Sequence, residues 1–304
     1  MEDLHQMPQI GDTDLPAAFQ AADHGSIQAK KNYLLATRID LILILIGAIS
    51  TSWAIESAQG RTVLAIFGAA SLGFGLLVSL YMKITDAERC WFGYRAVAES
   101  VKTISWRYMT RALPFGSDLS PKDADRMFVE HLAEILRMPR SQQSVLAGEV
   151  ASHAQITPGM RLVRDLTFEE RKAAYIRLRI RDEQMWYSSN AASNAKNSSR
   201  LLLAVIVCQG IAMTTAILLI SWADFNFNFS SVFSAAAVAL IAWLELKGHK
   251  ELAFSYAQAA HELGLILARE PYVESDEEFS GFVSDAENAI SREHTMWLAR
   301  RDNV

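Results

Sequence analysis

Two long stretches of this 304-residue chain, residues 17–113 and 159–270, contain no proline. The seven prolines of the chain all lie outside them. Proline removes a backbone donor and clashes with the preceding helical turn, so long stretches without it favour uninterrupted helices. We therefore expect one helix from about Thr62 to Arg111 and another from about Ser231 to Glu270.

Cysteine and catalytic motifs are also scarce. The two cysteines, Cys90 and Cys208, lie in different predicted helices, so they indicate neither a disulfide framework nor a metal site. The seven histidines are scattered, and the chain has no HExxH or CxxC spacing, Walker loop, GxGxxG or GxSxG. We therefore predict that the protein is not an enzyme and holds no metal or cofactor.

Charge is missing from several long apolar runs. Thr62–Met82, Leu201–Ala223 and Phe225–Leu244 contain no charged residue. Each has the roughly 20 helical residues needed to cross a hydrocarbon core of about 30 Å. Leu41–Ile55 is shorter, but it is long enough if it extends back to Arg38, whose side chain can reach the interface. A buried soluble helix is the alternative for this first run.

The two hairpins formed by these runs are copies of each other. They align without gaps, so one constant offset relates every matched pair. Arg38 matches Arg200 and Lys83 matches Glu245, while Phe92-Gly93-Tyr94 matches Phe254-Ser255-Tyr256. The chain is therefore predicted to contain two related membrane units.

We predict an all-α polytopic membrane protein with four transmembrane helices in two repeated hairpins, each with long cytoplasmic helical extensions. The first unit is expected at residues 1–112, with spans at about 38–55 and 62–82. A cytoplasmic linker follows at 113–158. The second unit is expected at 159–304, with spans at about 201–222 and 226–244 and a C-terminal helix.

The linker and C-terminus show shorter helical patterns. Ser120-Pro121, followed by acidic residues, is typical of a helix start. A second short helix is expected at about Gln142–His153. The last helix is expected at about Gly281–Arg300, with Phe282, Ala286, Ile290 and Trp297 on one side.

Lysine and arginine placement predicts the topology. Basic residues precede the first and third spans and follow the second and fourth, whereas the two interhelical turns carry only Arg61. Cytoplasmic segments are enriched in lysine and arginine. Both termini and the middle segment are therefore expected to be cytoplasmic. The segment before Gln28 shows no basic or long apolar stretch typical of a signal peptide.

The extensions carry matching apolar stripes. Tyr94, Val97, Val101 and Ile104 recur at steps of three and four and correspond to Tyr256, Ala259, Leu263 and Ile266. Ordinary helix packing explains such stripes, so we expect them to form the interior of the extensions.

Polar residues inside the spans suggest a pore. The candidate pore-lining residues are Thr51, Ser52, Glu56, Gln209, Thr214 and Thr215. Such groups can face a water-filled path. They can equally hold neighbouring helices together, as can the small residues Ser71 and Gly75. The sequence leaves both interpretations open.

Basic and aromatic residues gather next to the spans. Residues 161–200 contain nine basic and five acidic side chains, and residues 83–112 contain six and three. Positive charge with aromatics suits phosphates and bases, although topology and lipid contact explain many such residues. The candidate ligand-binding residues are Arg95, Lys102, Arg107, Arg177, Arg179, Arg181 and Trp186. The net charge of −5 argues against genomic DNA binding.

The chain resembles the SLATT family of bacterial two-span proteins, once in each half. The first half is similar in Ala22-Asp23, Ser26, Gln28, Trp91, Arg95, Glu99, Lys102 and Trp106. The second half is similar in Tyr175, Arg179, Asp182, Gln184, Trp186-Tyr187, Tyr256, Ala260, Glu262, Leu263, Ala286-Glu287, Glu293-His294 and Trp297. The family usually has one such unit per chain, so the number of subunits in an assembly is left open.

The resemblance implies an antiphage effector of the bacterial inner membrane. It would form an oligomeric ion-conducting pore, gated from the cytoplasm by a nucleotide or short oligonucleotide from a partner nucleotidyltransferase, and would cause growth arrest or death. The expected partners are further copies of the chain, the bilayer and this signal, which would open or close the pore. The alternative is a non-conducting scaffold or sensor that docks a cytoplasmic partner.

Overall fold

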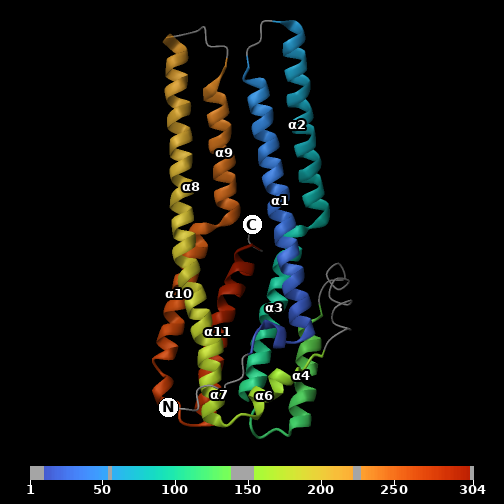
Figure 1. Cartoon of the computed structure of the whole chain (residues 1–304), viewed down its shortest axis with the longest axis vertical. Coiled ribbons are helices and arrows are strands. Elements are labelled where there is room, and N and C mark those ends of the chain that lie inside the picture. The colour runs from blue at the N-terminus through green and yellow to red at the C-terminus, as the bar shows by residue number, and fades with distance from the viewer. Residues whose placement is uncertain (1–9, 54–56, 138–153, 222–226, 302–304) are drawn as a thin grey trace. The chain divides into compact units, whose positions relative to one another are not determined.

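The computed structural model describes residues 10–53, 57–137, 154–221 and 227–301, and these are almost entirely helical. The chain divides into two compact units (Figure 1). The membrane unit consists of residues 30–87 and 191–254. The extension unit takes in the described parts of residues 1–29, 88–190 and 255–304. The expected helix at Gln142–His153 lies outside the described residues.

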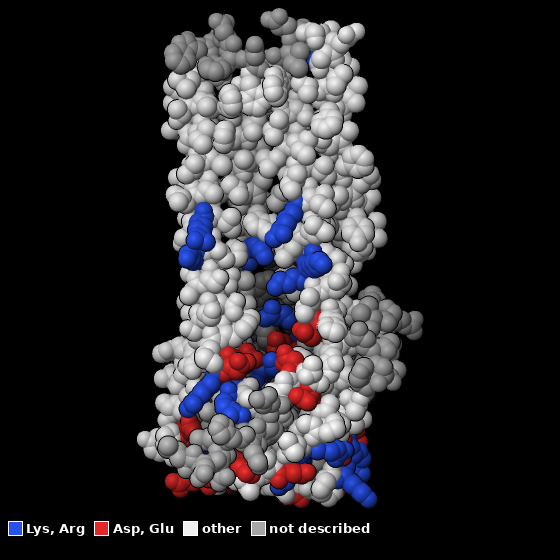
Figure 2. Space-filling view, in the orientation of Figure 1, with Lys and Arg blue, Asp and Glu red and all other residues white. Residues whose placement is uncertain are grey.

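Four helices of the described chain are long and apolar enough to cross a membrane. They contain α1 (Ala17–Thr51), α2 (Ala58–Thr85), α8 (Arg181–Ser221) and α9 (Phe229–Lys247). Only 11–17% of their most apolar windows is buried. These apolar side chains therefore face outward, which suits lipid rather than water. Figure 2 shows the same surface as a broad area without charged atoms. The predicted all-α polytopic fold is confirmed.

Small residues let α1 and α2 approach closely. An added Cβ on Gly47 would lie 3.0 Å from Cδ2 of Leu72, and one on Gly68 would lie 3.4 Å from Cβ of Ser50. Ser71 and Gly75 are both buried in the same helix pair. Their small side chains therefore serve helix packing in this hairpin.

The two hairpins turn at different points of the repeat. Helix α1 ends at Thr51, whereas α8 continues to Ser221, whose counterpart in the first copy is Gln59. At about 1.5 Å per residue, α8 rises about 12 Å further beyond Arg200 than α1 does beyond Arg38.

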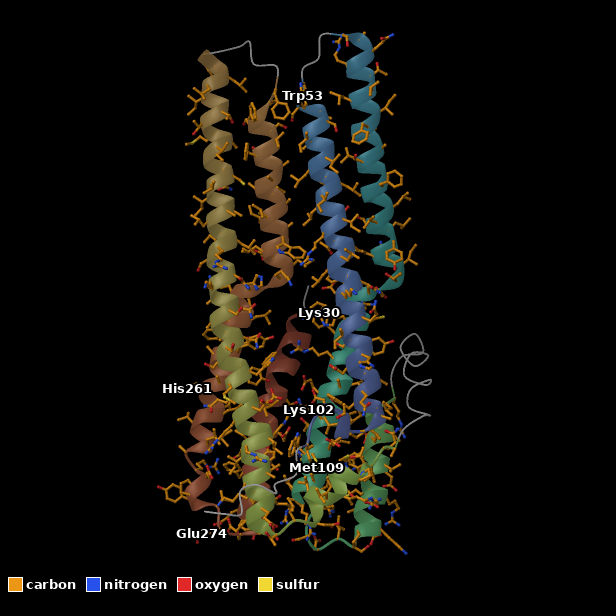
Figure 3. The ribbon with its side chains drawn as sticks, in the orientation of Figure 1. Lys30, Trp53, Lys102, Met109, His261 and Glu274 are labelled. Carbon is orange, nitrogen blue, oxygen red and sulfur yellow. The ribbon has the colours of Figure 1, made fainter. Side chains whose placement is uncertain are left out.

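The residues that follow α1 and those that precede α9 pair with each other. Asn228 N donates to Ser52 O at 2.8 Å, and Trp53 bridges to Phe227. Figure 3 shows Trp53 beyond the end of α1. The early end of α1 therefore leaves a backbone segment whose hydrogen bonds are supplied by the other hairpin.

Each exiting helix is interrupted at one equivalent residue. Asp86 (φ 45°) separates α2 from α3 (Ala87–Thr110), and Gly248 (φ 53°) separates α9 from α10 (His249–Leu267). The alignment that matches Arg38 with Arg200 also matches these two residues, so the break belongs to the repeat. The long helices expected from the absence of proline therefore form with one left-handed residue inside each.

The extension unit packs helices around an aromatic and aliphatic interior. Besides α3 and α10 it contains α4 (Pro121–Ile135), α6 (Pro158–Asp165), α7 (Phe168–Tyr175), the π-helix η3 (Ile176–Ile180) and α11 (Asp276–Arg301), with short 3-10 turns η2 (Asp12–Asp14) and η4 (Glu270–Tyr272).

The apolar faces predicted for this unit are largely buried. The first stripe is buried at Tyr94, Val97 and Val101, and the second is buried along α10. Phe282, Ala286 and Ile290 of α11 are also buried, while the side chain of Trp297 lies outside the described ones. Ser120 caps α4 by accepting from Asp123 N, as its sequence indicated.

Gly248 offers a test of the helix break. We expect Gly248→Ala to lower the stability of the detergent-solubilised protein by about 1–2 kcal/mol, because a Cβ disfavours the left-handed conformation. The nearest atom to that Cβ would be Glu251 Oε2 at 3.9 Å, so the cost comes from the backbone. Thermal unfolding followed by circular dichroism measures it. Gly210→Ala in α8 is the control, since it has open space and an ordinary helical conformation. Equal unfolding temperatures for the two variants would contradict the prediction.

Candidate functional site

Most hydroxyl groups in the membrane helices bond to their own helix. Thr51 Oγ1 donates to Gly47 O at 3.1 Å and Ser52 Oγ donates to Ala48 O at 2.6 Å. In α8, Thr214 and Thr215 do the same to Gly210 O and Ile211 O, both at 2.8 Å. Each proton is therefore satisfied without a partner helix, as is common for serine and threonine in helices.

Gln209 is different. Its side chain is exposed, and no hydrogen bond to it is found in the described part of the chain. It borders an open groove of about 360 Å³ between α8 and α9. The groove's lining combines this amide and two serine hydroxyls with small and apolar side chains: Gln209, Ala212, Met213, Ala216, Ser230, Ser234, Ala237, Val238 and Ile241.

The other candidate pore residues do not share this groove. A residue step turns a helix by about 100°, so Thr214 and Thr215 lie about 120–140° from Gln209 around α8. Thr215 instead borders a small cavity beside Phe227 and Phe229. Thr51 is exposed and Ser52 is 7% exposed at the end of α1. Glu56 lies outside the described residues.

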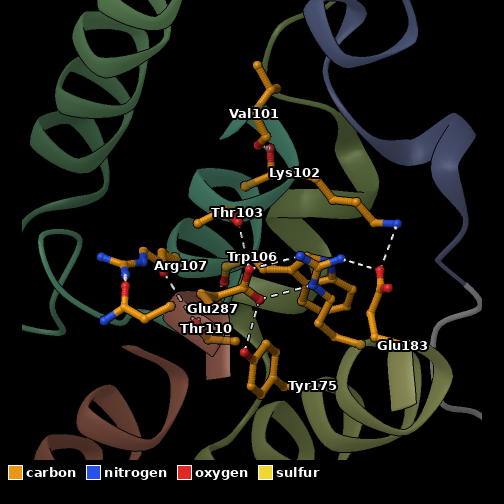
Figure 4. Close-up of polar contacts among 12 residues, drawn as sticks. Val101, Lys102, Thr103, Trp106, Arg107, Thr110, Tyr175, Glu183 and Glu287 are labelled. Atoms are coloured by element: carbon orange, nitrogen blue, oxygen red, sulfur yellow. Dashed lines mark hydrogen bonds and ion pairs between the residues drawn. The ribbon is translucent and has the colours of Figure 1, made fainter. Parts of the chain in front are cut away.

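The extension unit contains a buried ion pair between α11 and the π-helix that leads into α8. Arg179 and Glu287 are 1% and 0% exposed. Arg179 Nε and Nη2 donate to the two carboxylate oxygens of Glu287 at 3.0 and 2.9 Å, and Tyr175 Oη donates to the same carboxylate at 3.0 Å (Figure 4). This bidentate geometry is the strongest form of such a contact.

A second carboxylate extends the pair into a network. Arg179 Nη1 lies 2.6 Å from Glu183, which also contacts Lys102 Nζ at 3.3 Å. Thr103 donates to Glu287 at 2.9 Å. Burial alone lowers the pKa of Arg179, but the charges of Glu287 and Glu183 outweigh it and raise that pKa well above its usual value. We define these side chains as the Arg179 network: Lys102, Thr103, Tyr175, Arg179, Glu183 and Glu287.

The π-helix lies within a row of side chains spaced four residues apart. The row consists of Arg171, Tyr175, Arg179, Glu183 and Tyr187. On a regular helix such a row drifts by about 40° per step. The π-turn at Ile176–Ile180 has more residues per turn, so it offsets part of this drift.

Of the seven candidate ligand residues, Lys102 and Arg179 meet on the carboxylate of Glu183. Arg107 donates to Asn288 at 3.1 Å, and Arg95 is half-buried. Arg177 and Arg181 are exposed, with Arg181 lying 3.8 Å from Glu270. Trp186 is 43% exposed and stacks edge-on against Tyr187 and Tyr256.

The pattern of basic residues does not reveal the partners of these cations. Glu287 is indicated in the sequence only by the family resemblance, which includes Tyr175 and Arg179. Two further buried arginines carry no such indication. Arg164 donates to the carbonyls of Tyr108 and Phe115, and Arg171 lies 2.6 Å from Asp276. Sequence spacing alone does not separate these residues from surface charge, because their partners are distant in the chain.

An open groove of about 560 Å³ lies on the extension unit between α8 and α10. It is lined by Gln184, Met185, Ser188, Ser189, Ala260 and His261; Figure 3 labels His261 on α10. Arg181, Gln184 and Ser188 follow at steps of three and four, so they form one stripe on α8. Across the described residues, no three His, Cys, Asp or Glu side chains are grouped to hold a metal ion.

Two helical hairpins with lipid-facing surfaces, joined to helical extensions with a polar network inside, define a multi-pass all-α membrane protein. The chain belongs to the SLATT family. Residues 16–172 match SMODS and SLOG-associating 2TM effector domain 3, and residues 175–297 match SMODS and SLOG-associating 2TM effector domain 1. The tandem arrangement implied by the resemblance is therefore confirmed, and the chain is a membrane effector with two such domains. No curated protein and no solved structure gives a significant match.

The Arg179 network yields a stability prediction. We expect Glu287→Gln to lower the free energy of unfolding by about 3–5 kcal/mol, because it leaves a buried guanidinium without its main counter-charge. The control is Asp285→Asn on the same helix. Asp285 pairs with Arg269 at the surface, where both side chains are at least half exposed, so its loss should cost about 0–1 kcal/mol. Chemical unfolding followed by near-ultraviolet circular dichroism compares them, and similar losses would contradict a special role for Glu287.

Proposed function

We propose that this protein is an effector of antiphage defence that forms an oligomeric ion-conducting pore in the bacterial inner membrane. In this proposal both termini and the extension unit are cytoplasmic, and a nucleotide or short oligonucleotide signal gates the pore. The family match, which describes effector domains associated with SMODS and SLOG, supports the proposal.

Gln209 is the observation that carries the pore proposal. An amide in a membrane-spanning helix is costly unless it meets a polar group or water. Hydroxyls can bond to their own helix, but Gln209 has no such contact in the described residues, and it borders the groove with Ser230 and Ser234. Several copies around an axis would place these groups along a water-filled path.

The signal would bind the groove on α8 and α10. Gln184, Ser188 and His261 offer polar atoms there, and Arg181 extends their stripe with a positive charge for a phosphate. Arg179 is buried against Glu287 and Glu183, and Lys102 lies 3.3 Å from Glu183. Arg181 is exposed, and its carboxylate contact, to Glu270, is longer at 3.8 Å. We therefore propose Arg181, rather than these two, as the phosphate contact.

Helix α8 links the two functions. It runs without a break from Arg181 to Ser221 and includes Gln209 as well as the groove residues Gln184 and Ser188. The stretch of helix from Gln184 to Gln209 is about 38 Å long. A ligand that prefers one position of α8 would therefore bias the surroundings of Gln209 in the same direction.

Ion flux from liposomes tests the proposal. We expect the reconstituted protein to release trapped ions, and cyclic di- and trinucleotides to change the rate. Gln209→Leu should reduce flux about tenfold, since one polar contact in a span contributes about 1–2 kcal/mol. Thr214→Val is the matched control, because its hydroxyl bonds to its own helix, and it should retain flux.

Three results would overturn parts of the proposal. No conduction with or without nucleotides would favour the non-conducting scaffold or sensor. If Gln209→Leu and Thr214→Val reduce the ion flux equally, Gln209 is rejected as the pore residue. A nucleotide response that survives Arg181→Gln would reject the groove as the signal site while leaving the pore intact.

A further inference from the structure

Two cations share one indole ring in the membrane unit. The guanidinium carbon of Arg38 on α1 lies 5.0 Å from the ring centroid of Trp243 on α9. Lys247 Nζ, at the end of α9, lies 5.4 Å from the same ring. Cation–π contact with tryptophan holds each cation in place, so the ring keeps two positive charges close together.

No carboxylate neutralises these cations within the described residues. Neither Arg38 nor Lys247 forms an ion pair there, although such pairs are frequent in the extension unit. The nearby His249 adds no negative charge, and its Nδ1 lies 2.6 Å from Asn194 Oδ1. Burial and then the charge of Lys247 lower the pKa of His249, which favours its neutral form. Two like charges held beside one ring repel each other, and an anion next to them offsets this repulsion.

The position of the pair in the sequence indicates which anion. Arg38 precedes the uncharged run that begins at Leu41, and Lys247 follows the run that ends at Leu244. The ends of spans lie at the headgroup level, where tryptophan is also enriched. Basic pockets between transmembrane helices at this level bind phosphate headgroups. Figure 2 shows blue side chains where the uncharged surface of the membrane unit ends.

We propose that Arg38, Trp243 and Lys247 form a binding site for the phosphate of an anionic phospholipid. The planar guanidinium of Arg38 can donate two parallel hydrogen bonds to phosphate oxygens. Lys247 supplies a point charge, and Trp243 keeps both groups from turning away into water. The site does not depend on pore formation or on the signal.

The repeat supplies an internal control. Arg200 corresponds to Arg38, and Tyr81 and Thr85 correspond to Trp243 and Lys247. In the described residues Arg200 contacts no aromatic ring, and Thr85 provides no charge. The second copy's arginine thus has the same charge and the same place before its span, but lacks the other two components. One site per chain is therefore expected.

Native mass spectrometry of the detergent-solubilised full chain tests the site. With cardiolipin or phosphatidylglycerol, we expect saturable retention of one lipid per chain and little retention of phosphatidylcholine. Arg38→Gln and Lys247→Gln should each weaken anionic lipid binding about tenfold, and Trp243→Leu should also weaken it. Arg200→Gln should leave binding unchanged. Thermal unfolding of each variant confirms that it is folded. Arg38→Lys keeps the positive charge but removes the planar guanidinium.

Three outcomes would overturn the proposal. If Arg200→Gln weakens lipid binding as much as Arg38→Gln does, the lipid is attracted by the overall positive charge of the protein and not by this site. If Arg38→Gln binds lipid as well as the unchanged chain does, no site exists there. Lys247→Gln gives the same test if Arg38→Gln does not fold. If inorganic phosphate or ATP at millimolar concentration displaces the lipid through the same residues, the ligand is a soluble phosphate rather than a lipid.

Discussion

Backbone hydrogen bonding in a medium without water is the constraint on which this structure depends. Within hydrocarbon, every N–H and C=O group must find a partner in the chain. The apolar runs meet this requirement as helices, and their hydroxyls bond to carbonyls one turn earlier. Where α1 ends early, the residues after it pair with those before α9, through the hydrogen bond from Asn228 N to Ser52 O. The left-handed residues Asp86 and Gly248 lie outside the uncharged runs, where their irregular backbone can meet water.

Much of this fold could be predicted because charged residues and prolines limit the structure of the chain segment in which they occur. Uncharged runs indicate the four spans, and steps of three and four indicate the buried faces of α3 and α10. The helix breaks could not be predicted in this way. Gly248 is one glycine among fifteen, and aspartate at Asp86 is an ordinary residue for a solvent-exposed helix. Only their equivalence across the repeat, together with the backbone angles, identifies them as one feature.

The candidate site was harder to predict because its residues meet across long sequence distances. Arg179 and Glu287 are 108 positions apart, and Thr103 reaches Glu287 across 184. A basic residue next to a span looks the same in sequence whether it faces lipid, ligand or a buried carboxylate. Arg177, Arg179 and Arg181 alternate along one helix, yet Arg179 is buried and the other two are exposed. Residues two apart lie on opposite sides of a helix, but the sequence does not say which side is buried.

The two copies differ at the positions for which function is proposed. Each exiting helix has a left-handed residue, Asp86 after α2 and Gly248 after α9, whereas α1 and α8 contain none among their described residues. The polar amide occurs only in the second copy, since Gly47 occupies the place of Gln209 and packs against Leu72. Within the described residues, the paired cations occur only where the first copy's Arg38 meets the second copy's Trp243. A tandem chain can therefore assign close packing to one hairpin and polar exposure to the other, which two identical single-unit chains cannot do.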